Sequence, residues 1–331
     1  MEPEMHYAEY LKLDSILHAQ QLRSDTLNAH AHDEMLFIIM HQTYELWFKQ
    51  LLYELDSIMA ILRKPTVNDD SPELQTIVHR LNRSNSILKL LVQQIEVMET
   101  MSPMDFLDFR DMLRPASGFQ SWQFKLIEAK LGLKYEQRHG EAHYISPLNE
   151  SEKSLIRAAE SEKSLLELLN SWLERMPFFK DNDFWPGYRK LYMESLSEVE
   201  KGHAALFDTV FSEENGNYPR SLSPAACRAG LFIMIYPGYP ILQLPYRLLN
   251  QLLETDEQLS TWRYRHMHMV QRTIGTRIGT GGSSGRDYLQ GTLVKHFIFR
   301  DIAQLTSFLI ERKKLPKLDK QMESRLGFAS E

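Results

Sequence analysis

The sequence has few of the residues that mark secreted or membrane proteins. It contains one cysteine, Cys227, in 331 residues, so no internal disulfide can form, as is typical of a reducing compartment. No apolar run reaches the ~18 residues that a membrane-spanning helix needs. The N-terminus, Met-Glu-Pro-Glu-Met-His, has neither the basic nor the apolar region of a signal peptide. These absences predict a cytoplasmic protein with no membrane partner.

The chain also has fewer positively than negatively charged side chains. Lysine and arginine number 38 against 44 aspartates and glutamates, which gives a formal net charge of -6. Nucleic acids and anionic membranes favour a basic face on the protein that binds them. No basic run stands out, so neither is an expected partner.

Glycine and proline are scarce, and they divide the chain into long stretches with a helical pattern. Apolar residues recur there at intervals of three and four, and no alternating strand with a hairpin signal appears. The fold class we predict is all-α, a helical bundle of long helices in a single domain over 1–331. Residues 133–222 would form a helical insert and connectors. The expected helices are 5–20, 32–64, 71–101, a short one after Ser102, 119–131, 150–175, 184–211, 223–278 with a turn at 236–240, and 291–312.

One predicted helix carries a histidine just before a glycine-rich segment. On a helix, His266 shares a face with Trp262 and Met269, whereas His268 points away. The two histidines therefore cannot chelate one metal ion, and no His-Glu-x-x-His motif offers a zinc site. His266 is either a core histidine among apolar neighbours or the one axial ligand of a haem.

The segment Gly279-Thr-Gly-Gly-Ser-Ser-Gly285 is too rich in glycine for a helix, where each glycine costs roughly 1 kcal/mol relative to alanine. Such a loop either serves as a flexible linker or lets backbone N–H groups and small hydroxyls approach a ligand. It lacks the lysine of a phosphate-binding loop and follows a helix. A nucleotide is therefore not its expected ligand.

Taken together, Trp-Arg-Tyr-Arg-His266 and Gly-Thr280-Gly-Gly-Ser-Ser-Gly resemble the tryptophan 2,3-dioxygenase family. The resemblance spans nearly the whole chain and implies that the bundle encloses a haem pocket. It also implies that His266 is the axial ligand of the iron and that Thr280 receives the ammonium group of the substrate. Because no Cys-x-x-Cys-His motif could attach a haem covalently, the expected cofactor is haem b.

A second motif lies on the predicted helix 32–64. Phe37 and His41 are four residues apart on one face, with Tyr44 nearby. A histidine on such an aromatic stripe is ordinarily core packing, but the run Phe-Ile-Ile-Met-His-Gln-Thr-Tyr-Glu-Leu-Trp-Phe-Lys is similar to the family's distal-pocket motif. The resemblance implies that Phe37 and Tyr44 form apolar walls for an indole. His41, the catalytic candidate, would accept the indole N–H.

A third motif places an arginine among aromatic residues. Phe106 and Arg110 share a face of the short helix after Ser102. A buried guanidinium needs an anion, which is either a protein carboxylate or a ligand. Asp-Phe-Arg110-Asp-Met-Leu-Arg-Pro-Ala-Ser-Gly-Phe-Gln-Ser resembles the family's substrate-carboxylate motif, which implies that role for Arg110 and a wall position for Phe106.

The first predicted helix, 5–20, carries an aromatic stripe that includes Tyr7, Tyr10 and Leu11. From the residues alone, this helix either docks on its own core or on another chain. The family segment that it resembles completes the substrate pocket of a neighbouring subunit. The resemblance therefore implies a homo-oligomer, expected as a tetramer.

The implied reaction is the cleavage of the indole C2–C3 bond of L-tryptophan by O2 on ferrous haem b, giving N-formyl-L-kynurenine. This is the first step of tryptophan catabolism by the kynurenine pathway. Two alternatives stay open: a haem-dependent monooxygenase or hydroxylase on the same scaffold, and a non-enzymatic haem-based gas sensor. The chain departs from the family pattern at 236–240, where Tyr-Pro-Gly-Tyr-Pro replaces an expected Arg-Asp-Glu before the proline.

Overall fold

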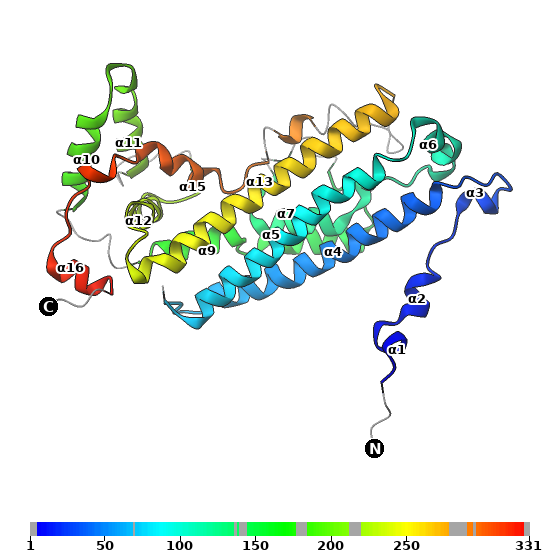
Figure 1. Cartoon of the computed structure of the whole chain (residues 1–331), viewed down its shortest axis with the longest axis horizontal. Coiled ribbons are helices and arrows are strands. Elements are labelled where there is room, and N and C mark those ends of the chain that lie inside the picture. Colours follow the sequence, from blue (N-terminus) through cyan, green and yellow to red (C-terminus); the bar gives the residue numbers. More distant parts are fainter. Residues whose placement is uncertain are drawn as a thin grey trace.

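The structure is a computed structural model that describes residues 5–68, 70–135, 138, 144–176, 184–211, 220–277, 290–293 and 296–327. Every regular element in these residues is a helix (Figure 1). The predicted all-α class is therefore confirmed, whereas the assignment of 1–331 to a single domain stays a prediction.

Four helices form the bundle that carries the candidate site. They are α4 (Glu34–Leu62), α5 (Pro72–Met98), α7 (Trp122–Leu131) and α13 (Pro240–Ile274). Helix α5 packs against both α4 and α13, and α7 packs against α4. In Figure 1, α4, α5 and α13 run side by side along the long axis of the molecule.

Local sequence signals decide where these helices begin and end. Ser71 caps α5 by accepting the N–H of Leu74, and Pro72 occupies the first turn. Pro240 starts α13, and Gly275 ends it with a φ of 59°. The helices predicted at 32–64, 71–101 and 119–131 are confirmed, as is the division at 236–240.

Shorter helices surround this bundle. In Figure 1, α10, α11, α12, α15 and α16 gather at the end of the bundle away from α6 (Pro103–Arg110). No single described helix is long and apolar enough to cross a membrane, and α12 with α13 meets that test only as a pair bent by 111°. The bounds are α8 Glu150–Ser161, α9 Leu165–Leu173, α10 Phe184–Ser195, α11 His203–Phe211, α12 Pro224–Ile235, α15 Arg300–Gln304 and α16 Lys320–Arg325.

The predicted helix 5–20 is wrong as a continuous element. It consists of α1 (Tyr7–Leu11) and α2 (Leu13–Leu17), because Lys12 takes a left-handed conformation with a φ of 53°. Neither helix has a buried residue. Short helices depend on packing for their stability, so nothing here favours continuing the helix through Lys12.

Three other predicted helices are also interrupted. Ser164 begins α9 with a capping box to Glu167, which separates it from α8. Helices α10 and α11 are divided by a 3-10 turn at Glu198–Glu200. The helix predicted at 291–312 is interrupted: residues 291–293 are helical, and α15 and a 3-10 turn, Leu305–Phe308, follow after a break. At the break, Asp256 accepts the N–H groups of residues 298 and 299 and holds a turn there.

The N-terminal segment leaves the bundle as an arm. Helix α3 (Arg23–Thr26) is fixed to the start of α4 by the buried Glu34, whose carboxylate accepts the N–H groups of Arg23 and Ser24, each at 2.8 Å. Beyond α3, the arm formed by α1 and α2 extends away from the bundle (Figure 1). We refer to residues 5–18 as the arm below.

Candidate functional site

The candidate site lies where two apolar clusters meet. The main core fills the bundle, and Tyr44 packs against it. A separate cluster includes Phe109, with Phe37 and Phe106 packed against it. On α4, His41 stands between Phe37 and Tyr44, and so between the two clusters.

His266 faces this region from α13. Its ring stacks on the indole of Trp262, with centroids 5.0 Å apart and an interplanar angle of 25°. Burial, together with the nearby His41, lowers the pKa of His266 to about 4. By contrast, His268 is exposed and packs against Tyr264. The prediction that His268 points away from the helix face of His266 is confirmed.

The proton on His41 can be assigned from its surroundings. Its Nδ1 lies 2.7 Å from the carbonyl oxygen of Phe37, and a carbonyl can only accept, so Nδ1 carries the hydrogen and Nε2 holds a lone pair. His41 is exposed as a residue, yet desolvation by the protein around it lowers its pKa. His41 is thus a neutral hydrogen-bond acceptor at neutral pH.

Aromatic rings form one wall beside His41. The ring centroid of Phe37 lies 4.2 Å from that of His41, 5.8 Å from that of Phe106 and 5.6 Å from that of Phe109. Arg110 follows in the last turn of α6 and is only 5% exposed. The structure therefore brings Phe37, His41 and Phe106 together and buries Arg110 at the same wall.

Tyr44 is placed differently from these residues. Its hydroxyl donates to the carbonyl of Leu91 at 2.6 Å, and its ring lies 6.3 Å from that of Trp262. Burial raises the pKa of Tyr44 to about 12. The nearby Trp262 lowers the pKa of Tyr44, which offsets part of the effect of burial. The Nε1 of Trp262 itself has no hydrogen-bond partner among the described residues. Tyr44 thus packs on the His266 side of the site.

The remaining predicted site residues are not in this wall. Thr280 lies outside the described residues. Tyr7 and Tyr10 are each 70% exposed and Leu11 is 37% exposed, all on the arm. Within one chain, the structure does not bring these three residues to the site.

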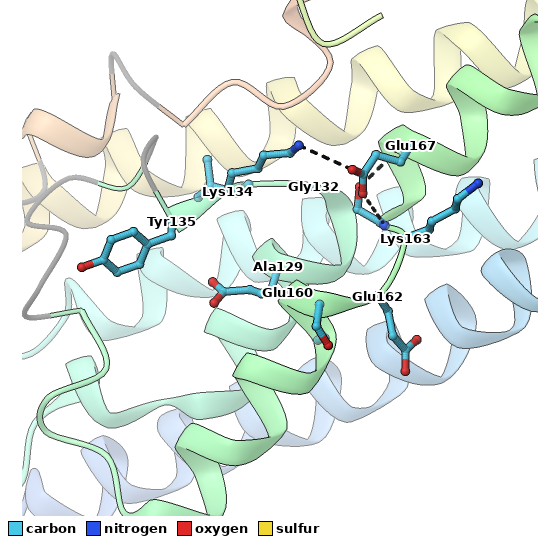
Figure 2. Close-up of a pocket in the computed structure, with 12 residues that line it drawn as sticks. Ala129, Gly132, Lys134, Tyr135, Glu160, Glu162, Lys163 and Glu167 are labelled. Atoms are coloured by element: carbon cyan, nitrogen blue, oxygen red, sulfur yellow. Dashed lines mark hydrogen bonds and ion pairs between the residues drawn. The ribbon is translucent and has the colours of Figure 1, made fainter.

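A separate hollow of about 390 Å³ lies between the ends of α7 and α8 and the start of α9 (Figure 2). Two of its charged groups, Lys134 and Glu167, lie 3.4 Å apart, and Glu160 and Glu162 pair with the arginines Arg138 and Arg63 outside the hollow. Gly132 turns the chain there with a φ of 126°, and a Cβ on it would lie 2.9 Å from the Cβ of Leu166. None of the predicted site residues lines this hollow, so it is not the candidate site.

Comparison with known proteins shows which family this chain is similar to. The family model described as tryptophan 2,3-dioxygenase matches residues 1–215 and 195–309. The tryptophan 2,3-dioxygenase of Bdellovibrio bacteriovorus is 43% identical over 98% of this chain and 99% of its own length. That of Dictyostelium discoideum is 42% identical over 98% and 88%, and that of Mus musculus is 39% identical over 95% and 84%.

The chain belongs to the tryptophan 2,3-dioxygenase family. Members of this family are oxidoreductases, and membership implies a haem cofactor and the use of O2. The resemblance drawn from the motifs around His41, Arg110 and His266 is thereby confirmed at the level of the family. The roles of the individual residues stay predictions.

The side chains of this dioxygenase fit a haem better than a bare metal ion. Among the described residues, no group of three histidine, cysteine or acidic side chains could hold an ion, whereas a haem needs only axial ligands from the protein. His266 supplies one neutral imidazole where the two apolar clusters meet. Its Nδ1 is buried with no hydrogen-bond partner among the described residues, and Nε2 is the other nitrogen through which it can bind iron.

Several polar residues behind the site have hydrogen-bond partners that the sequence could not identify. Gln123 on α7 donates to the carbonyl and carboxylate of Glu45, one turn after His41. Glu128, also on α7, lies 2.7 Å from Arg263, which is three residues before His266. A glutamate within the apolar run Leu-Ile-Glu-Ala is a signal of burial, but its partner is 135 residues away and no spacing identifies it.

Proposed function

We propose that this chain inserts both atoms of O2 across the indole C2–C3 bond of L-tryptophan and releases N-formyl-L-kynurenine. The observation that carries the proposal is the placement of two neutral imidazoles, His41 and His266, where the two apolar clusters meet in a chain of this family. One imidazole can bind iron, and the other can accept a hydrogen bond from the substrate.

His266 would hold the iron of haem b as its axial ligand. Its low pKa supports this role, because the lone pair that binds iron stays unprotonated at neutral pH. Stacking on Trp262 restrains the ring. Ferrous haem b, when bound, supplies the binding and activation of O2.

His41 would receive the indole N–H of tryptophan at Nε2, since Nδ1 already donates to the carbonyl of Phe37. The rings of Phe37 and Phe106 suit the apolar faces of an indole. Tyr44 would support this pocket from the His266 side. In this role His41 orients the substrate, and its neutral state is what allows it to accept.

Arg110 would bind the substrate carboxylate through its planar, permanently charged guanidinium. Thr280 would receive the ammonium, a role that rests on the family resemblance alone. Together the two groups would select a zwitterionic amino acid over free indole.

We further propose a homo-oligomer, with a tetramer as the expected form, in which the arm of one subunit enters the pocket of another. The exposure of Tyr7 and Tyr10 supports this, since large rings gain most when they are buried at an interface. The extension of the arm away from its own bundle supports it as well (Figure 1).

The reaction is tested with the haem-loaded, reduced protein, L-tryptophan and isotopically labelled O2. Mass spectrometry of the product should find both labelled atoms in N-formylkynurenine. Incorporation of one labelled atom would instead identify a monooxygenase. Oxygen binding in the absorption spectrum without any product would identify a sensor.

A further inference from the structure

A buried carboxylate on α7 holds three side chains from other parts of the chain. Glu128 accepts Arg138 at 2.8 Å on Oε2, Arg263 at 2.7 Å on Oε1, and lies 3.3 Å from His296 Nδ1. The side chains of all four residues are 6% exposed or less. Burial by itself would raise the pKa of Glu128. The hydrogen bond from His296 and the charges of Arg138 and Arg263 outweigh that effect and hold its pKa well below the usual range.

This cluster fixes the part of α13 that carries His266. Arg263 precedes His266 by three residues, within one helical turn. Its guanidinium also donates to the backbone carbonyl of His296 at 3.3 Å. Asp256, two turns earlier on α13, holds the next residues of the same segment by accepting the N–H groups of Ile298 and Phe299. Helix α13 is therefore tied to α7 and to residues 296–299 close to the turn that carries His266.

The histidine itself has little else to orient it. Metal-binding histidines usually donate their second ring nitrogen to a carboxylate or carbonyl, which sets the ring orientation. In this chain, Nδ1 of His266 has no such partner among the described residues. The ring direction then depends on the rotation of α13 about its axis and on stacking against Trp262.

A buried ion cluster is also a poor choice if stability is the only requirement. Apolar side chains of similar volume are often as stable as a buried ion pair or more so, because the desolvation cost of the charges is avoided. What charged groups add is a defined geometry. The bond of Glu128 to Arg263 allows one rotation of this turn, whereas an apolar contact would allow several.

We propose that Glu128 is a positioning residue for the haem ligand: by binding Arg263 it sets the rotation of α13 that presents His266 to the pocket. The inference rests on the proposed role of His266. It assigns to Glu128 no contact with substrate or haem.

The test uses Glu128→Gln in the full-length, haem-loaded protein. Two properties are measured: the rate at which ferric haem passes to excess apomyoglobin, and the iron–histidine stretching band of the ferrous form in resonance Raman spectra. Loss of a group that orients a metal ligand typically weakens metal binding about 10- to 100-fold, so haem loss should accelerate by that order. The iron–histidine band should shift or broaden.

Glu54→Gln is the matched control. Glu54 is equally buried and binds Arg83 at 2.8 Å and lies 3.9 Å from Arg80, between α4 and α5. It is thirteen residues from His41, roughly 20 Å along α4 at 1.5 Å per residue. Its loss should lower the melting temperature and leave haem retention and the Raman band unchanged. If both variants lose haem in proportion to their loss of stability, Glu128 is a structural residue only and the proposal is overturned.

A double variant, Glu128→Gln with Arg263→Met, keeps the test decisive if the single variant does not fold. The double variant should restore folding, because Arg263 no longer leaves a charge without its partner and Arg138 keeps Glu160, 3.6 Å away, while haem loss stays fast. Wild-type haem retention in this variant would overturn the proposal. His266→Ala in the same assay separates the two claims: if it keeps its haem, the proposed function fails whatever Glu128 does.

Discussion

At the scale of single residues, a backbone carbonyl decides how His41 can act. Because Phe37 takes the hydrogen on Nδ1, only Nε2 faces a ligand, and only as an acceptor. The two possible roles of His41, orienting group and general base, differ in how much activity is lost when the side chain is removed. A lost orienting hydrogen bond costs about 2- to 10-fold in rate or affinity, whereas a lost general base costs about 100- to 10,000-fold.

We predict that His41→Ala lowers kcat/KM for tryptophan about 10-fold and does not abolish turnover. With 1-methyltryptophan, which has no indole N–H to donate, the same substitution should have a smaller effect. Steady-state kinetics on both substrates provides the measurement, with haem content as the control. Complete inactivation of a variant that keeps its haem would identify His41 as an essential base.

The pH dependence follows from the same residue. Burial lowers the pKa of His41, so the folded protein keeps the ring neutral at pH values where an ordinary histidine, with a pKa of about 6.5, begins to gain a proton. In wild type, kcat/KM should therefore hold as pH falls through that value and decline only below it. This acid decline should be weaker in His41→Ala. An identical decline in the two proteins would assign it to another group.

His266 and His268 offer a matched pair, two residues apart on one helix. His266→Ala should abolish stoichiometric haem binding or displace the Soret band, because the proposed axial imidazole is removed. His268→Ala should leave both unchanged, since His268 is exposed and packs against Tyr264. Spectra of the two purified variants, taken with a pyridine haemochrome assay, decide the matter. Equal effects would reject the assignment of the ligand.

At the scale of elements, the cap of α6 controls residues that the substrate would touch. Ser102 accepts the N–H of Asp105 while the carboxylate of Asp105 accepts the N–H of Ser102. An N-cap of this kind contributes about 1 kcal/mol to its helix. Helix α6 has only eight residues, and it carries both Phe106 and Arg110.

Ser102→Ala should therefore raise KM for tryptophan severalfold with haem still bound, because α6 frays. Arg110→Ala sets the upper limit of this rise in KM. A hydrogen bond to a charged group contributes about 1.5–3 kcal/mol, which corresponds to roughly 10- to 150-fold in affinity. Ser71→Ala is the control: it removes the same kind of cap from α5, at the opposite end of α4 from His41. An equal rise in KM in the Ser71 variant would show that the effect is global.

The elements that could be predicted are those whose ends are determined by residues at the ends themselves. Ser71-Pro72 and Pro240 mark their helices in the sequence itself, and the aromatic motif on α4 identified His41 and Phe37. The elements predicted wrongly depend on distant contacts or on none. The turn at 298–299 is set by Asp256, 42 residues away, and the break at Lys12 occurs where no packing supports a helix. Glu128 was missed for the same reason, since its partners come from three separate segments.

At the scale of the whole molecule, two groups of exposed apolar side chains each lie along one element or segment. The arm carries Tyr7 and Tyr10, and α4 carries Ile39, Leu46 and Tyr53 at intervals of seven residues, all of them exposed. An interval of seven keeps side chains along one stripe of a helix. Extended apolar stripes are costly in water and mark interfaces, and closed symmetry lets each subunit give one arm and receive one.

If the arm works in trans, the active unit is an oligomer whose pockets are each built from two chains. Deleting residues 1–17 should then raise KM for tryptophan while much of the haem stays bound, because His266 is untouched. The decisive experiment mixes an Arg110→Ala subunit with a Tyr7→Ala/Tyr10→Ala subunit and lets them exchange. Mixed oligomers would contain some pockets with both defects and some with neither, so activity should rise above that of either parent. Exchange is verified with differently tagged subunits, and each parent carried through the same procedure is the control. Mixtures no more active than their parents, in oligomers shown to have exchanged, would mean that each pocket is built from a single chain.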